Sequence, residues 1–439
     1  VITENSRVQQ GWENLPELML NIKSDQVEGR YGYRPVTLFT FATEIALFGQ
    51  DPFWGHFNNT LLYGVLAALL FFLLTRLFPN LSEAFSFWVV GLFVVHPLHT
   101  EVVANIKSRD ELLALLFGIA GLGCYHLFTK HKKWGHYLLA TVLFTFGFLS
   151  KESAITLAGC CLLLPLLAPS KNPLQYVKEA LPAFGIIATL IVVYFLSHSD
   201  WLFRDNSSEL YNSGLYMENG AIGNPLFGVS DFSTLLANAF YILWLNLEQF
   251  FLVLSLLHDY SYNQIPLADW THWKVWMAAL LHVGLLALAI KVIFQKPLLS
   301  FGIFFYGITA FVYLHLFAES PDFIANRYLF APSFGLCIVL VLSIQWASGF
   351  LKASPSIPFR FILGVGIIFL SYQTFQRNNV WKNNRTLFES DLPHLQNCAR
   401  LHFNYARLLQ KDYNEAGQQA NGALQRQMIH HYRRSMKYR

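Results

Sequence analysis

The segment His56–Leu77 reads HFNNTLLYGVLAALLFFLLTRL, with Arg76 its one charged residue. A helix needs about 20 mostly apolar residues to cross the hydrocarbon core of a bilayer, so this segment predicts a membrane-spanning helix. The whole chain of 439 residues fits the same class, being 54% hydrophobic and 13% charged with a mean hydropathy of +0.37. Soluble domains carry about 25% charged residues. The composition excludes a soluble, disordered, collagen-like or disulfide-scaffold protein and leaves an all-α polytopic membrane protein.

Ten further apolar stretches follow this segment, so we expect about 10–11 membrane helices. The stretch Pro35–Phe48 is apolar but shorter, which favours an interfacial helix. The further spans are Ala84–Val95, Leu112–Phe128, Trp134–Leu149, Ala154–Leu167, Leu181–Leu196, Leu235–Leu257, Val275–Phe294, Leu298–Phe317, Tyr328–Leu351 and Phe361–Phe375.

The C-terminal tail has a soluble composition. Residues 377–439 hold 11 Lys and Arg against 4 Asp and Glu, whereas charge is sparse in the rest of the chain. We therefore divide the chain into a first external loop with interfacial helices (1–55), a transmembrane domain (56–376) and the start of an external helical domain (377–439). The chain begins with Val1 rather than Met, and we expect it to be a fragment that lacks its N-terminus.

Membrane orientation follows from the loops rich in Lys and Arg, which face the cytoplasm. The other loops are acidic and hold most of the unusual polar residues, so we place them in the periplasm or the ER lumen. Both flanks of Leu235–Leu257 are then external, and Glu248 inside it favours a re-entrant element that lines a cavity. The external set is 96–111, 150–153, 197–272 and 319–327.

Charged residues at the ends of predicted spans are the candidate functional residues, because ionisable groups at membrane depth are costly. Pro97 ends one apolar run and leaves His96, His99 and Glu101 at the external boundary. Lys107, Arg109, Asp110 and Glu111 open the next helix. Further polar groups lie at Arg34, Lys151-Glu152, His258–Tyr262 and Arg327-Tyr328. The alternatives are snorkelling charges, local ion pairs and interfacial aromatic residues.

Such groups are suited to an enzyme that transfers the sugar of a lipid-linked phosphosugar to an acceptor. Cations can hold the leaving phosphate, and a carboxylate can deprotonate the acceptor hydroxyl. A transporter could offer the same residues. The sequence holds no HExxH, GxGxxG or Walker motif, so neither a zinc nor a nucleotide site is supported, and nothing indicates nucleic-acid binding.

A resemblance to a known family favours a sugar-transferring enzyme over a transporter. The chain resembles the transmembrane and tetratricopeptide-repeat (TPR) O-mannosyltransferases over nearly its whole length. The motifs that carry this resemblance are Tyr33-Arg34-Pro35, His96-Pro97-Leu98-His99-Thr100-Glu101, Lys151-Glu152, Asp259-Tyr260-Ser261, Arg327-Tyr328-Leu329-Phe330 and Arg377-Asn378 with Trp381.

The resemblance implies a GT-C fold, a dolichyl- or polyprenyl-phosphate mannose donor and inverting transfer to Ser and Thr of exported proteins, with no cofactor required and metal dependence open. It also implies an acidic catalytic pair just upstream of Val1, so that the true base precedes this chain. The candidate residues are catalytic Glu101, His99 and Asp110; phosphate-binding Arg327, Arg34, Lys107, Arg109 and Lys151; and sugar- or acceptor-binding Asp259, Tyr260, Tyr328 and Glu152. We expect them to converge in one water-filled pocket.

The tail resembles the beginning of a TPR array and would bind an exported acceptor or a partner protein. Its TPR-like helices are His402–Leu409 and Met428–Met436, whereas Gln418–Gly422 fits the repeat poorly. Two alternatives stay open, namely sugar transfer to a lipid or glycan acceptor, and a non-catalytic TPR scaffold of a secretion complex. We expect a multi-pass protein whose active face and tail are periplasmic or ER-lumenal, and the compact loops favour a bacterial source.

Overall fold

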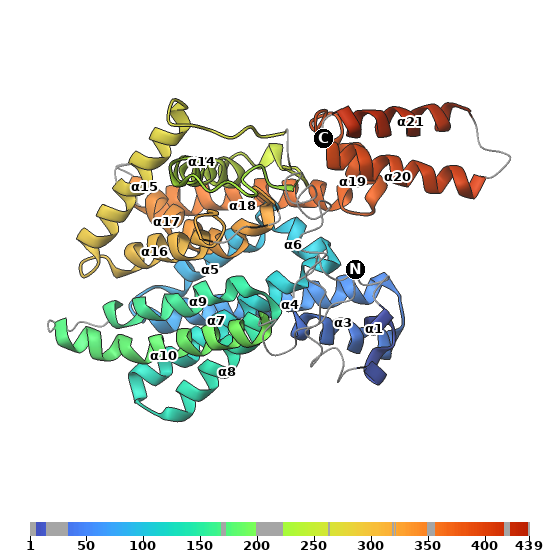
Figure 1. Ribbon diagram of the computed structural model, residues 1–439. Helices are drawn as coiled ribbons and strands as arrows, with labels where there is room; N and C mark the ends of the chain where they lie inside the picture. The colour runs from blue at the N-terminus through green and yellow to red at the C-terminus, as the bar shows by residue number, and fades with distance from the viewer. Residues whose placement is uncertain are drawn as a thin grey trace. The chain divides into compact units, whose positions relative to one another are not determined.

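The computed structural model describes residues 6–14, 34–167, 173–198, 223–261, 264–317, 320, 322–348, 356–416 and 422–437. Within these ranges every regular element is a helix (Figure 1). The predicted features at Val1, Tyr33, Tyr262 and most of 418–422 lie outside the described residues. The prediction of an all-α polytopic membrane protein with a helical C-terminal region is confirmed.

Six helices of the described chain are long and apolar enough to cross a membrane. A seventh span is possible if α5 (Glu83–Val94) and the bent segment Pro97–Ala104 form one crossing. The six are α4 (Pro52–Leu77), Ile106–His131 with α7 (Arg109–His131), Tyr176–Leu196 of α10 (Pro173–His198), α15 (Trp273–Val292), Asn326–Ser348 with η7 (Asn326–Leu329) and α17 (Phe330–Ser348), and Pro358–Val380 of α18 (Ser356–Val380).

The remaining predicted spans also fall on helices, but these are shorter or less apolar than a full crossing requires. Helix α14 ends at Phe251, so the predicted stretch Leu235–Leu257 is not one continuous helix. The helices concerned are α8 (Trp134–Ser150), the run Glu152–Leu167, α14 (Phe232–Phe251) and α16 (Pro297–Phe311), and the interfacial candidate is α3 (Pro35–Phe48).

Local sequence explains where these helices begin and bend. Asp51 caps α4 by accepting a 2.9 Å hydrogen bond from the backbone N–H of Phe53, and Pro52 occupies the first helical position. Pro97 follows α5 and produces a bend of 51° because its ring cannot continue the hydrogen-bond ladder. The bend leads directly into η2 (Pro97–His99) and α6 (Thr100–Ala104), which carry the predicted polar motif.

The chain forms two compact units. Unit 1 comprises Val1–Arg204, Gly284–Phe311 and Phe330–Tyr372. Its helices α7 and α8 lie side by side (Figure 1), and α16 packs closely against α17. A Cβ atom at Gly335 would lie 2.5 Å from the carbonyl oxygen of Gly302, so this close approach requires glycine.

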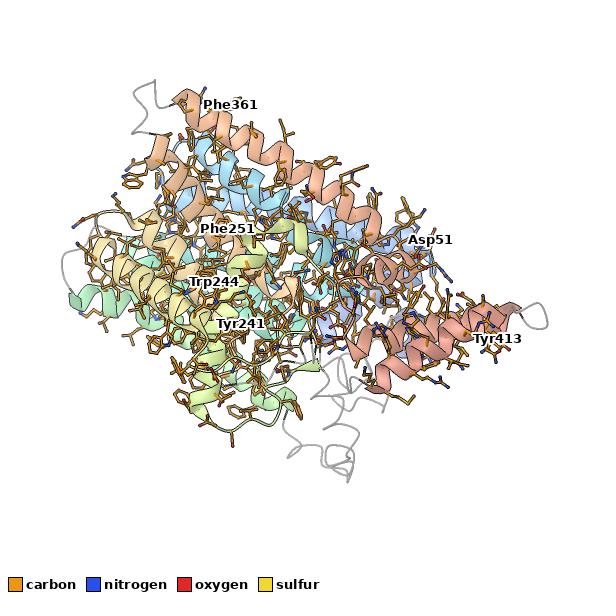
Figure 2. The ribbon with its side chains drawn as sticks, turned by 90° about the horizontal axis from the view of Figure 1, so that it is seen from above. Asp51, Tyr241, Trp244, Phe251, Phe361 and Tyr413 are labelled. Carbon is orange, nitrogen blue, oxygen red and sulfur yellow. The ribbon has the colours of Figure 1, made fainter. Side chains whose placement is uncertain are left out.

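Unit 2 comprises Asp205–Val283, Val312–Leu329 and Gln373–Arg439. Tyr241, Trp244 and Phe251 are distributed along α14 (Figure 2). The tail contributes α19 (Asn384–Asp391), α20 (Ala399–Ala416) and α21 (Gly422–Lys437), and the last two pack against each other as a hairpin (Figure 1). Its small core holds the buried side chains Leu387, Phe388, Leu395, Cys398 and Leu401.

Candidate active site

Unit 1 contains a cluster of buried and partly buried ion pairs around the N-terminus of α7. Arg34 Nη1 donates to Asp110 Oδ2 at 2.5 Å and Arg34 Nη2 to Glu152 Oε2 at 3.1 Å. Lys151 Nζ binds Glu111 Oε1. Asp110 and Glu111 occupy the first turn of α7, where the helix dipole favours negative charge. The structure therefore brings together four predicted residues from three distant segments, namely Arg34, Asp110, Lys151 and Glu152.

Arg109 is bound on several sides and is 1% exposed. Its Nη2 donates to Glu44 Oε2 at 2.6 Å, and its Nε donates to Asn59 Oδ1 at 2.8 Å. Its guanidinium also lies 4.4 Å from the centre of the Phe41 ring. These contacts join α3, α4 and α7, so Arg109 holds three helices together beside the ion-pair cluster.

His99 is buried, and hydroxyl groups face both of its ring nitrogens. Its Nδ1 lies 2.8 Å from Tyr63 Oη, and its Nε2 lies 2.9 Å from Ser333 Oγ. The rings of Phe93 and Phe330 pack against the imidazole, with centroids 4.3 and 5.0 Å away. Tyr63 carried no sequence signal, because a single Tyr in an apolar helix is commonplace, whereas Ser333 directly follows the motif that begins at Arg327.

Two further candidates lie on the segments next to this cluster. Glu101 is 3% exposed in the first turn of α6, and Lys107 lies in η3 (Ile106–Ser108), immediately before α7. The catalytic and phosphate-binding roles of all these residues stay predictions.

Unit 2 contains a second polar cluster, which surrounds Asp322. Arg327 Nη2 binds Asp322 Oδ2, and Arg400 Nη1 donates to Asp322 Oδ1 at 2.6 Å. Arg400 Nε also lies 3.7 Å from Asp259 Oδ2. Burial would lower the pKa of Arg400, but Asp259 and Asp322 outweigh it and raise that pKa above its ordinary value. The predicted residues Arg327 and Asp259 are thus joined through Asp322 and Arg400, which the sequence did not single out.

These residues line a cavity of about 160 Å³. The loop after α14 supplies one wall, the segment 322–327 a second, and α19 and α20 a third. The lining residues are His258, Asp259, Tyr260, Asp322, Ile324, Ala325, Arg327, Phe388, Arg400 and Asn404.

Tyr260 and Tyr328 have different surroundings. Tyr260 Oη donates to Asn326 Oδ1 at 3.1 Å and accepts from the backbone N–H of Leu257 at 2.9 Å, which orients the ring in the cavity wall. The ring of Tyr328 stacks on Tyr313 with centroids 4.2 Å apart, and it is not among the cavity-lining residues. Arg327 belongs to unit 2, whereas Glu101 and Lys151 belong to unit 1, so their convergence in one pocket stays a prediction.

Among the described residues, no group of three or more His, Cys, Asp or Glu side chains is placed to hold a metal ion. All five cysteines are free thiols in the structure.

Comparison with known proteins relates both clusters to one family. The family model described as dolichyl-phosphate-mannose-protein mannosyltransferase matches residues 34–199, which include Arg34, Asp110 and Lys151. The human protein O-mannosyl-transferase TMTC1 is 27% identical over 443 residues, covering 92% of this chain and 48% of the human protein. Human TMTC3 is 28% identical over 87% of this chain and 43% of its own length, and human TMTC4 is 27% identical over 87% and 56%.

The chain spans about half the length of the curated relatives that it matches. No solved structure matches it with statistical significance. The three relatives described above are human proteins, and a bacterial source stays a prediction. The family model covers the first ion-pair cluster and the relatives align along nearly the whole sequence, so the predicted resemblance to the transmembrane protein O-mannosyl-transferases is confirmed.

Proposed function

We propose that the chain transfers mannose from a dolichyl- or polyprenyl-phosphate donor to Ser and Thr hydroxyls of exported proteins, on the non-cytosolic face of the membrane. The observation that carries the proposal is the ion-pair network of buried Asp110, Glu111 and Lys151 with partly buried Arg34 and Glu152, inside the family-matched segment. Buried charges in a membrane domain are costly, and their default interpretation is functional.

The network is suited to binding the donor phosphate. Arg34 already binds two carboxylates through different nitrogens, and a guanidinium fork can bind phosphate oxygens in the same way. Two cations, Arg34 and Lys151, lie among three carboxylates. If the Arg34 side chain bound a donor phosphate in place of Asp110 or Glu152, a carboxylate in the cluster would lose its cation. The donor's polyprenyl chain would remain in the bilayer.

The reaction requires one bond to form and one to break. The acceptor oxygen attacks the anomeric carbon from the face opposite the phosphate, and the phosphate leaves with the electron pair of the broken C–O bond. A carboxylate takes the hydroxyl proton. Asp110 and Glu101 are the candidates for this proton. The cations stabilise the charge that develops on the phosphate.

The test is a transfer assay on the chain in lipid nanodiscs, with radiolabelled polyprenyl-phosphate mannose and a Ser/Thr-rich peptide. Positioned acid–base and charged groups contribute about 100-fold or more, so Arg34→Gln and Lys151→Gln should lose at least about that factor. Lys132→Gln is the matched control, because Lys132 lies 3.7 Å from Glu179 in an ion pair of the same unit and its side chain is 58% exposed. Inactive wild-type protein, or full activity in both cluster variants, would overturn the proposal.

A non-catalytic membrane scaffold is the second candidate. The observation that favours it is that carboxylates of the chain already bind Arg34, Arg109 and Lys151. A scaffold predicts that the cluster variants lower thermal stability while the wild-type chain transfers no mannose. Transfer to a lipid or glycan acceptor is distinguished in the same assay by replacing the peptide.

A further inference from the structure

The cavity of unit 2 depends on the C-terminal helices. Phe388 of α19 and Arg400 and Asn404 of α20 line it together with residues from the loop 258–260 and the segment 322–327. With a volume of about 160 Å³ it is smaller than the roughly 300–1,000 Å³ of most small-molecule pockets. Its size therefore fits one small ligand group and not a lipid chain.

Asp259 and Arg400 face each other across a gap that is too wide for a direct hydrogen bond. Arg400 Nε and Asp259 Oδ2 are 3.7 Å apart, beyond ordinary hydrogen-bond length. Both groups are otherwise held in place, because Arg400 Nη1 donates to Asp322 and Asp259 Oδ1 accepts from the backbone N–H of Ser261 at 2.9 Å. A hydroxyl group both donates and accepts, so it can bridge the two.

The charges of the cavity cancel. Arg327 and Arg400 are balanced by Asp259 and Asp322, which removes any net attraction for an anion. Part of the remaining surface is aromatic, and the rings of His258 and Phe388 lie against each other with centroids 5.4 Å apart. Planar charged groups that bind hydroxyls, next to aromatic faces that contact C–H groups, match the two surfaces of a pyranose ring.

We propose that this cavity binds one neutral hexose unit, with a sugar hydroxyl bridging Asp259 and Arg400. The choice of mannose rests on the proposed function, whereas the preference for a neutral hexose rests on the cavity itself. The hexose could belong to a free mannoside or to a mannose already attached to an acceptor peptide. The C-terminal tail would then contribute residues to the sugar site, in addition to its predicted binding of an acceptor or partner protein.

The test is saturation-transfer-difference NMR on the full chain in nanodiscs, with methyl α-mannopyranoside and an O-mannosylated Ser peptide as probes. Arg400→Lys keeps the charge that binds Asp322 but loses the planar Nε donor, and Asn404→Ala removes a lining amide. We expect each variant to bind the probes at least tenfold more weakly. Arg407→Lys is the control, because Arg407 is an exposed residue of the same helix and does not line the cavity.

The outcomes separate the site from the reaction. Binding of either probe that is lost in Arg400→Lys and kept in Arg407→Lys supports the cavity, and the tighter probe identifies the source of the hexose. No binding of either probe, equal binding in Arg400→Lys, or displacement of the mannoside by an equal concentration of inorganic phosphate overturns it. Mannoside binding without transfer would refute the proposed function alone, and transfer without such binding would refute the cavity alone. Unchanged circular dichroism melting confirms that the variants fold.

Discussion

Asp391 Oδ2 accepts two hydrogen bonds from His258, each 2.7 Å long, one from the backbone N–H and one from ring Nδ1. Arg377 donates to both oxygens of the same carboxylate, at 2.9 and 3.2 Å. The Asp391 side chain is 1% exposed, and burial alone would raise its pKa. The hydrogen bonds from His258 and Arg377 outweigh burial and lower that pKa to about 2. Asp391 thus ties the end of α19 to the cavity-lining loop at His258 and to the end of α18.

Replacing Asp391 with Asn should destabilise unit 2. Removing one partner of a buried ion pair costs about 3–5 kcal/mol, because the other charge is left buried. Burial, with Asp259 nearby, raises the pKa of the Cys398 thiol to about 12, and Cys398 lies in the same small core. The rate of alkylation of Cys398, followed by mass spectrometry of its peptide, should rise by at least roughly 100-fold if labelling follows local opening.

Asp412→Asn is the control for this measurement. Asp412 pairs with Arg385, and both side chains are substantially exposed, at 30% and 44%. Exposed pairs contribute about 0–1 kcal/mol, so alkylation of Cys398 should change little. Equal rates in the two variants would show that Asp391 does not hold the tail.

Acidification should loosen the α20–α21 hairpin. His402 Nδ1 lies 2.8 Å from His431 Nδ1, so the two imidazoles cannot both be protonated without repulsion. Burial, with neighbouring charges, lowers the pKa of His402, and burial together with His402 and His430 lowers that of His431 to about 4. Both folded-state values lie below the unfolded value of about 6.5, so the unfolded hairpin binds more protons.

This stabilisation is complete above about pH 6.5 and is lost as the pH falls toward 4. The full shift of His431 corresponds to about 3 kcal/mol, which partial exposure reduces to about 1–2 kcal/mol. Hydrogen exchange of α20 and α21, corrected for the intrinsic rate, should be faster at about pH 5.5 than at about pH 7.5. His431→Gln should reduce the difference in exchange rate between the two pH values. Protection that does not depend on pH in the wild type would contradict the prediction.

The sequence could predict the long spans but not the partners of the polar residues. The span predicted as His56–Leu77 lies on the helix Pro52–Leu77, and it was predictable because lipid requires a helix to satisfy its own backbone and about 20 apolar residues reveal one. The charges near α7 were visible as anomalies in an apolar chain. Arg34 and Asp110 are 76 residues apart, however, and no local pattern encodes such a pair. Asp322, Asp391 and Arg400 lie in polar surroundings, where one more charge is unremarkable.

Transfer should depend on Arg327 and Glu101. Arg327→Ala removes a guanidinium of the unit 2 cavity, and Glu101→Ala removes a buried carboxylate from the unit 1 motif that follows Pro97. Each should lower transfer of radiolabelled mannose to a Ser/Thr peptide by about 100-fold or more. Glu83→Ala, at an exposed first turn, should leave turnover unchanged. Unchanged turnover in both variants would remove these residues from the site.

Arg109 should act through helix packing, because Glu44, Asn59 and Phe41 surround it in the unit 1 core. Arg109→Met leaves Glu44 buried without its guanidinium, which should cost about 3–5 kcal/mol and lower the melting temperature. Adding Glu44→Leu removes the stranded charge, and an apolar pair of similar volume is often neutral or stabilising. The double variant should therefore regain both the melting temperature and mannose transfer. A double variant that is stable but inactive would instead assign Arg109 to the donor phosphate, since only that role requires the charge itself.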